Sequence, residues 1–215
     1  MNDIMQKDPT TELNTIISYW FGPTNQDKPF DMQSIEMQRW YGKSPEIDQD
    51  IKRRFEGLYV QLHSNEVASV FERRPILDQL AIIITLDQFP RNMYRESAKM
   101  YQADAKALEL CDILVNNSEF EQLDLFKQMF GTLPMMHAED KAMQRETVRH
   151  FTRFVDHTNS TASPNLDFFE NALGFALQHQ KIVDRFGRYP HRNEILGRTT
   201  TTEELEFLQQ PDSSF

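Results

Sequence analysis

The sequence predicts an all-α protein of about eight or nine antiparallel helices in a single compact domain over residues 1–215. Apolar residues recur at the i, i+3, i+4 spacing of one helix face along almost the whole chain, and no useful length alternates with the period of two that a strand needs. Only seven glycines occur in 215 residues, which argues against glycine-rich nucleotide loops and many-turned β folds. We find no clean 34-residue self-similarity, so these observations allow a repeat architecture without establishing one.

In the first half of the chain, proline or a capping side chain marks most helix starts. Asp8 precedes the first helix, and Ser44 followed by Pro45 is a typical pair of N-cap and first helical residue. Pro75 opens a helix whose apolar density marks it as the most buried one, and Pro90 is expected to end it. The helices predicted here cover residues 9–21, 45–62, 66–71 and 75–89, and a short segment around residues 32–40 lies between the first two.

In the second half, one helix is expected over 103–115. Ser118 with Glu121 fits a capping box for the next helix, which Gly131 is placed to close. A long helix should run from about His137 to residue 155, before a polar loop over 157–165 that ends in Ser163-Pro164. The remaining predictions are a long helix ending at Gly187, a turn over 193–196 and a last helix with Thr200 and Glu203 as its capping box.

Net charge and cysteine content indicate which kinds of partner and which cellular location to expect. Twenty-three basic against thirty-three acidic residues give a formal net charge of −10, the wrong sign for steering toward nucleic acid or an anionic membrane. The single cysteine, Cys111, can form no internal disulfide, and the sequence shows neither a membrane-spanning apolar run nor a signal pattern. We therefore expect a cytoplasmic protein that binds neither nucleic acid nor membranes.

The motif DQFPRN places Asp87 in the last turn of the most buried helix, where a negative charge opposes the helix dipole. Arg91, four residues on, could reach back and form a bidentate pair with this carboxylate. Such a pair either fixes the turn after the helix or, in a cleft, binds a polar ligand. Both interpretations stay open at this point.

The motif LPMMHAED places His137 near a predicted helix start, with Asp140 on the same polar side. Three interpretations are open: a solvated or salt-bridged first turn, a His–carboxylate general acid/base pair, and a metal site that would need further ligands from elsewhere. His179 has apolar neighbours along its helix, so it is either a core histidine with a buried polar partner or a pocket-lining residue.

The segment 185–198 concentrates positive charge, with four arginines against one glutamate and a formal charge of +3. It contains Arg185, His191, Arg192 and Arg198. One interpretation is a nest for a carboxylate or phosphate, and a second is a structural clasp in which the arginines pair with buried acids such as Asp87 or Asp140. A nucleic-acid patch is disfavoured because no longer basic stripe accompanies the segment.

Together, the aromatic-Gly start at residues 20–22, DQFPRN, LPMMHAED, His179 and the segment 185–198 resemble the bacterial domain of unknown function 924 family over nearly the whole chain. The resemblance implies an all-α fold like that of tetratricopeptide repeats. It implies no activity, substrate or cofactor. Because the polar motifs occur as a set, we expect them to converge around one pocket or groove.

Three functions follow as alternatives. The first is binding of an anionic small molecule or an acidic peptide segment in a pocket lined by Arg and His side chains. The second is an enzyme in which His137 or His191 is a general acid/base oriented by Asp140 or Asp87. In this alternative, arginines of the two motifs, Arg91, Arg192 and Arg198, stabilise negative charge on a phosphate or carboxylate substrate. The third is an interaction scaffold with internal polar clasps. The candidate binding residues are Asp87, Arg91, His137, Asp140, His179, Arg185, His191, Arg192 and Arg198. The sequence specifies neither a metal nor a cofactor.

Overall fold

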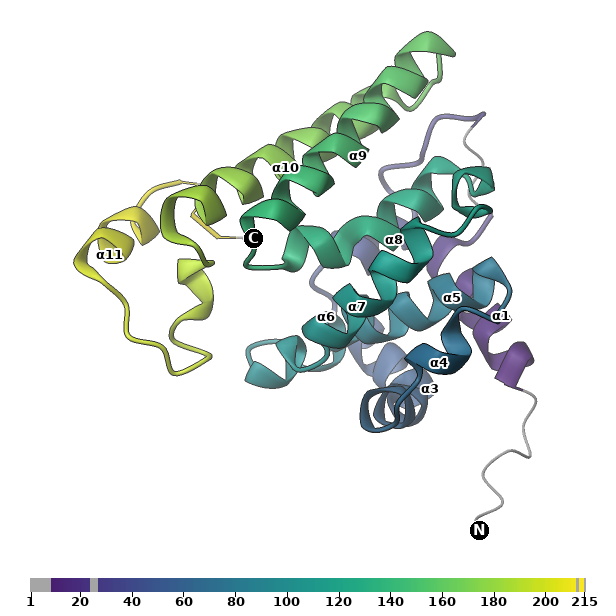
Figure 1. The fold of residues 1–215 in the computed structure, drawn as a ribbon, viewed down its shortest axis with the longest axis horizontal. Coiled ribbons are helices and arrows are strands. Elements are labelled where there is room, and N and C mark those ends of the chain that lie inside the picture. Colours follow the sequence, from purple (N-terminus) through teal and green to yellow (C-terminus); the bar gives the residue numbers. More distant parts are fainter. Residues whose placement is uncertain (1–8, 24–26, 212, 215) are drawn as a thin grey trace.

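The computed structural model describes residues 9–23, 27–211, 213 and 214, and within these ranges every regular element is a helix (Figure 1). The predicted all-α fold class is therefore confirmed. Within the same ranges, no helix combines the length and the apolar character needed to cross a bilayer. The predicted cap Asp8 lies outside the described residues.

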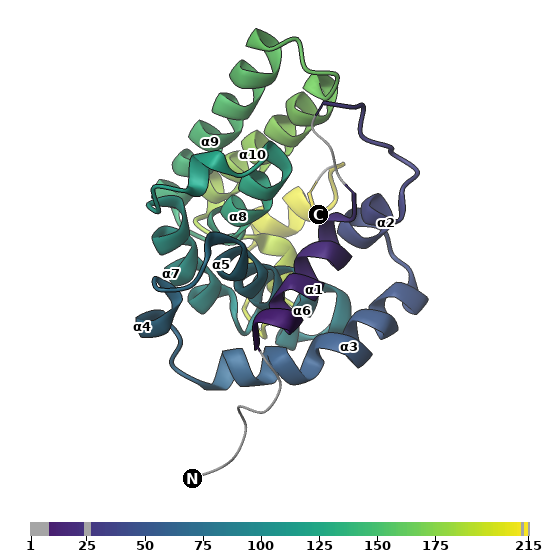
Figure 2. The same cartoon turned by 90° about the vertical axis from the view of Figure 1, so that its right-hand side faces the viewer.

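In the first half of the chain, the central helix is α5. The elements are α1 (Pro9–Phe21), α2 (Ile35–Tyr41), α3 (Pro45–Ser64), α4 (Ala68–Phe71) and α5 (Ile76–Ile83). Ser44 caps α3 as predicted, since its hydroxyl accepts the N–H of Ile47 at 3.4 Å and Pro45 follows it. α5 packs between α1 and α7, the arrangement seen in Figure 2, and this position explains its dense apolar sequence.

The most buried helix does not end at Pro90, contrary to the sequence prediction. A π-helical turn, Ile84–Gln88, continues α5 without a break into α6 (Phe89–Met93). In this turn the Phe89 N–H donates to the Ile84 carbonyl, five residues back. The hydrogen-bond register therefore shifts by one residue, and the proline falls in the first turn of α6, where its missing N–H is tolerated.

The described part of the second half contains short 3-10 turns and two long helices of 20 and 21 residues. The elements are η2 (Ala98–Tyr101), α7 (Asp104–Val115), η3 (Phe120–Gln122), α8 (Leu125–His137), α9 (Lys141–Ser160), α10 (Leu166–Phe186), η4 (Pro190–Arg192) and α11 (Thr202–Leu208). α9 and α10 form a long antiparallel pair that projects at the top of Figure 1, and α11 lies beyond the far end of α10. Paired antiparallel helices are consistent with a TPR-like array, which stays a prediction.

His137 ends α8, whereas the sequence predicted it at the start of the next helix. The prediction took Gly131 as the residue that closes this helix, but Gly131 lies inside α8, which continues to His137. A Cβ at Gly131 would come within 2.9 Å of Leu114 Cδ2 and 3.2 Å of Phe120 Cε2. The glycine therefore permits close packing of α8 on its neighbours, a role that its sequence context does not distinguish from that of a helix-ending glycine.

Other helix starts lie close to, but not at, the predicted residues. The N-caps are Asp124 for α8, Asn165 for α10 and Thr201 for α11, where the sequence predicted Ser118, Ser163 and Thr200. Each of these segments holds several adjacent Ser, Thr, Asp or Asn side chains that can cap a helix, so the pattern alone does not fix the register. The predicted end of α10 is confirmed, since Gly187 adopts a left-handed φ of 69° there.

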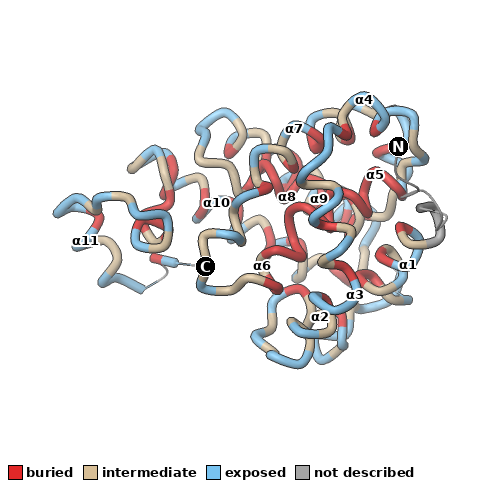
Figure 3. Tube along the Cα trace, turned by 90° about the horizontal axis from the view of Figure 1, so that it is seen from below, coloured by how far each residue is buried: buried red, intermediate tan, exposed pale blue. Residues whose placement is uncertain are grey.

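The buried residues, red in Figure 3, gather along α5 and α8. Trp20, Phe21 and Trp40 belong to this core, as expected for the aromatic clusters of the first helices, whereas Tyr41 is exposed. Cys111 is also buried, and its Sγ lies 3.1 Å from the Gly131 carbonyl. Burial raises the pKa of this thiol, so Cys111 is a packing residue of the core.

Candidate functional site

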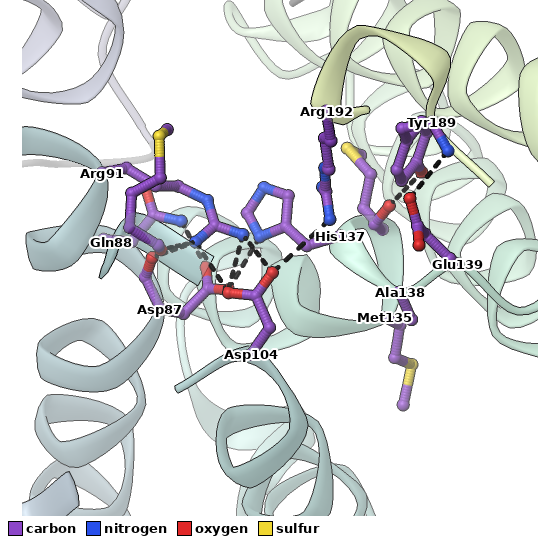
Figure 4. Close-up of polar contacts among 12 residues, drawn as sticks. Asp87, Gln88, Arg91, Asp104, Met135, His137, Ala138, Glu139, Tyr189 and Arg192 are labelled. Carbon is purple, nitrogen blue, oxygen red and sulfur yellow. Dashed lines mark hydrogen bonds and ion pairs between the residues drawn. The ribbon is translucent and has the colours of Figure 1, made fainter. Parts of the chain in front are cut away.

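Residues from distant parts of the chain meet in a partly buried polar cluster (Figure 4). Asp87 comes from the π turn, Arg91 from α6, His137 from the end of α8 and Arg192 from η4. Asp104, the first residue of α7, contacts both arginines. These five residues are called the polar cluster below, and four of them are candidates from the sequence.

Asp87 is fully buried at the centre of the polar cluster. Its Oδ1 lies 2.7 Å from Nδ1 of His137 and 3.6 Å from the Arg91 guanidinium, and Gln88 Nε2 donates to its Oδ2 at 2.6 Å. Burial alone would raise the pKa of the Asp87 carboxyl, but the contacts with His137 and Arg91 outweigh it and hold that pKa well below its ordinary value. Asp87 is therefore ionised at neutral pH.

His137 is held by this carboxylate in one tautomer. A carboxylate can only accept a hydrogen bond, so Nδ1 carries the proton and Nε2 carries a lone pair. Burial and the nearby Arg91 lower the pKa of His137 against the opposing effect of Asp87, so the ring is neutral at pH 7. Among the described residues, none forms a hydrogen bond with Nε2. A neutral imidazole oriented by a buried carboxylate is the arrangement of a general base.

Arg91 is engaged by protein acceptors. It donates to both carboxylate oxygens of Asp104, at 2.9 and 3.1 Å, and to the main-chain carbonyls of Asp87 and Met100 at 2.9 and 3.3 Å. Burial would lower the pKa of Arg91, but the two carboxylates raise it instead. The predicted bidentate pair therefore forms with Asp104, because the Asp87 side chain is turned toward His137.

Arg192 differs from Arg91 because its donors are not used. Its side chain is buried, with a residue exposure of 7%, and its Nη1 lies 3.6 Å from Asp104 Oδ2, too far for a hydrogen bond. The buried Nε has no hydrogen-bond partner, and the guanidinium carbon lies 4.6 and 4.4 Å from the ring centroids of Tyr101 and Tyr189. Burial and the positive charge of Arg91 lower the pKa of Arg192.

A pocket of about 320 Å³, called the site pocket below, lies beside the polar cluster, where α8 faces α10. Its polar lining includes Gln88, Arg91, His137 and His179, and most of the remaining lining is aromatic or aliphatic. His179 is buried, and its Nδ1 donates to the Phe175 carbonyl at 2.8 Å. Burial lowers the pKa of His179 to about 3, so it is neutral at pH 7. The structure thus places His179 both in the core and on the pocket wall.

The other arginines of the segment 185–198 bind carboxylates and hold the C-terminal part together. Arg188 donates to both oxygens of Glu204 at 2.7 and 2.8 Å, and Arg198 donates to both oxygens of Glu139 at 2.6 and 3.0 Å. Arg185 forms a more exposed ion pair near the surface. These three residues lie outside the polar cluster, so within one segment most arginines form clasps and Arg192 does not.

Two further candidates have positions that the sequence did not predict. Asp140 is exposed, and its Oδ1 caps α9 by accepting main-chain N–H groups at 2.8 and 2.9 Å. The carboxylate partner of His137 is therefore Asp87 and not Asp140, because the two residues of the HAED motif belong to different helices. His191 packs on Tyr189 with ring centroids 5.6 Å apart, and burial lowers its pKa to about 4.

Sequence reasoning missed the parts that Gln88, Tyr101 and Tyr189 take in the site, and it gave no partner for Asp104. Gln88 follows Asp87 directly. Both residues belong to the π turn, which places their side chains together at the site, so recognising that turn would have identified Gln88 as a site residue. The contacts of Asp104 with the two arginines and of Tyr101 with Arg192 join residues far apart in the sequence, so local spacing does not predict them. Tyr189, by contrast, lies only three residues before the Arg192 that it contacts. Within the described ranges, no group of three or more His, Cys, Asp or Glu side chains is arranged to hold a metal ion.

The fold and the site define an all-helical protein with a partly buried cluster of ionised and neutral polar groups beside a mostly apolar pocket. The chain belongs to a family of bacterial proteins of unknown function, DUF924, which matches residues 16–212. It is similar in structure to a protein of unknown function, ATU0120 from Agrobacterium tumefaciens, at a TM-score of 0.69 and 29% identity, over 94% of this chain and 99% of that one. No curated protein matches the chain.

Proposed function

We propose that the protein binds an anionic small molecule, with its negative group at Arg192 and its remainder in the site pocket. The observation that supports this proposal is the buried guanidinium of Arg192, which forms no hydrogen bond with any described residue. Burying a charge without hydrogen bonds is unfavourable, and the planar guanidinium fork matches a carboxylate or a phosphate. A bound anion would supply the missing acceptors.

The environment of Arg192 favours an anion over a further protein carboxylate. Asp104 already receives two hydrogen bonds from Arg91, so it does not depend on Arg192 for neutralisation. Because burial and Arg91 lower the pKa of Arg192, its charged form is destabilised in the unliganded protein, and a nearby negative charge would reverse that effect. Tyr189 lies between this position and the pocket, since its ring centroid is 4.4 Å from the Arg192 guanidinium carbon and 5.5 Å from the ring centroid of His179, which lines the pocket.

The test is thermal unfolding of the protein in increasing concentrations of inorganic phosphate, sulfate, citrate and acetate, at constant ionic strength. A ligand at about 100 times its dissociation constant stabilises the folded state by about 2.7 kcal/mol, an easily measured shift. We expect at least one anion to raise the melting temperature. The variant Arg192→Gln should lose this rise and keep a baseline near that of the wild type, because Asp104 retains Arg91.

Arg188→Gln is the matched control, since it removes an arginine from the same segment. It leaves the buried Glu204 without two hydrogen bonds, so its baseline melting temperature should fall while the anion-dependent rise remains. The proposal is wrong if no anion stabilises the wild type, or if Arg192→Gln keeps the full effect. Stabilisation by acidic peptides alone would indicate the carboxylates of a partner protein in place of a small molecule.

A second candidate function is acid/base catalysis by His137, which the hydrogen bond of 2.7 Å to Asp87 favours. The neutral ring could take a proton from water or from the ligand through Nε2, while the ionised Asp87 stabilises the imidazolium that forms. Negative charge that develops on the substrate would lie near the two arginines.

The test of this candidate compares His137→Asn with the wild type. The Asn amide can still donate to Asp87, but it has no group in place of Nε2. Hydrolysis of carboxylic and phosphoric p-nitrophenyl esters should fall by at least a hundredfold in the variant, while anion binding persists. Equal rates in both proteins would contradict a catalytic role for His137.

A further inference from the structure

We infer that the anionic molecule is an amphiphile, with an acidic head at the polar cluster and an unbranched apolar tail in a second groove along α10. This inference rests on the proposed function, because it names the class of ligand for the same site. It also assigns a ligand to the second groove, which the anion at the polar cluster alone would leave empty. A fatty acid is the simplest member of this class.

The second groove has a volume of about 450 Å³ and lies where α2 and the segment before it face α10. Phe30, Met32, Met37 and Phe168 contribute much of its lining. This composition gives a broad apolar surface, made partly of flexible thioethers that adapt to an unbranched chain. We call this surface the apolar groove.

The apolar groove and the site pocket share part of their walls. Tyr41, Ala172 and Phe175 line both cavities, so a molecule that fills one of them extends naturally into the other. His137 and Arg91 are found only on the site-pocket side, and Met32 and Phe168 only on the groove side. The combined space is therefore polar at one end and apolar at the other, as an amphiphile requires.

The apolar groove also gathers exposed apolar side chains. Met32 is 58% exposed, and Tyr41 and Phe175 are each 54% exposed. Single exposed apolar residues are ordinary, but a group of them around one concave surface is typical of a binding site. Burial of this surface by an alkyl chain would remove it from water, at about 25 cal/mol for each Å².

Asn165, which lines the apolar groove together with the polar residues Asp167 and Asn171, does not favour a peptide partner over a tail. Asn165, the N-cap of α10, has its side chain bound to the main chain of the groove's other wall. Its Oδ1 accepts the N–H of Phe30 at 2.7 Å, and its Nδ2 donates to the carbonyl of Lys28 at 2.9 Å. This amide therefore holds the two walls together and does not offer its hydrogen bonds to an incoming backbone.

The test is isothermal titration of the full chain with sodium acetate, butyrate, hexanoate, octanoate and decanoate below their micellar concentrations. Inorganic phosphate serves as the probe of the head position alone. Each methylene that enters the apolar groove should tighten binding about fourfold, equivalent to about 0.8 kcal/mol. In Phe175→Gln the longer acids should bind at least tenfold more weakly, while the affinity for phosphate stays unchanged.

Leu177→Gln is the matched control, since Leu177 is 47% exposed on the same helix and lines neither cavity. It should bind every acid as the wild type does. If phosphate and acetate bind but the affinity does not increase from acetate to decanoate, the inference is overturned and the proposed function still stands. Tight binding of decanoate that Arg192→Gln does not weaken would overturn the head-and-tail orientation. Binding of an amphipathic peptide in place of the long acids would identify a partner-protein surface and also overturn it.

Discussion

Replacing Asp87 with alanine removes the acceptor that holds the polar cluster together. The side chain is fully buried, and its loss would leave the ring of His137 and the amide of Gln88 without the hydrogen bonds of 2.7 and 2.6 Å. It also removes a carboxylate 3.6 Å from Arg91. Loss of one partner from a buried ion pair costs about 3–5 kcal/mol, a large part of the 5–15 kcal/mol that typically stabilises a domain.

This cost should be measured by urea unfolding at pH 7, followed by circular dichroism. For a chain of this length it corresponds to a fall in melting temperature of roughly 6–20 °C. Asp140→Ala is the matched control, because it removes the same carboxylate from an exposed helix cap and should cost about 1 kcal/mol. Equal losses for the two variants would refute the central position that we assign to Asp87.

A second variant covers the case in which Asp87→Ala does not fold. Asp87→Asn keeps the shape and one acceptor but removes the negative charge. Because the carboxylate raises the pKa of His137 against the effect of burial, that pKa should fall further in Asp87→Asn. Titration of the His137 ring by NMR measures it, and an unchanged pKa would contradict the contact.

Two other predictions concern pH and backbone conformation. The pKa of His179 is lowered to about 3 by burial, and those of His150 and His191 to about 4, so the unfolded chain, with histidine pKa values near 6.5, binds more protons than the folded one. Stability is therefore complete above about pH 6.5 and should fall steadily toward pH 4; a melting temperature that is flat between pH 7 and 5 would contradict the buried neutral rings. Gly187→Ala should destabilise the protein by about 1 kcal/mol, because residue 187 has a left-handed φ of 69°. Gly57→Ala should stabilise it by about 0.5–1 kcal/mol, because Gly57 lies inside α3 and a Cβ there meets open space. Urea midpoints that shift in the same direction for the two variants would contradict this pair of predictions.

The all-α fold class and most helix positions can be predicted from the sequence, because they depend on the local spacing of apolar residues and on capping residues. Ser44 with Pro45, and Gly187, mark real helix ends because each acts through its own backbone. Pro90 and Gly131 misled the prediction for physical reasons. The π turn realigns the hydrogen bonds ahead of Pro90, and packing against Leu114 leaves no room for a side chain at Gly131.

The candidate site was predictable as a set of residue types but not as a set of pairs. The Arg91 guanidinium was expected to form a bidentate pair with the Asp87 carboxylate, four residues away, yet its two hydrogen bonds to a carboxylate go to Asp104, 13 residues away. Arg192 looks like its neighbours in the segment 185–198, and only the fold shows that it lies beside an acid that another arginine already neutralises. Such differences arise from tertiary packing, which local spacing does not encode.

Anomalous diffraction from crystals soaked in sodium bromide tests the central claim most directly, because it locates an anion without requiring knowledge of the natural ligand. The account predicts a bromide within hydrogen-bond distance of the Arg192 guanidinium in the wild type, and none at that position in Arg192→Gln. A guanidinium hydrogen-bonded to protein carboxylates on all sides, with no bromide beside it, would contradict the account.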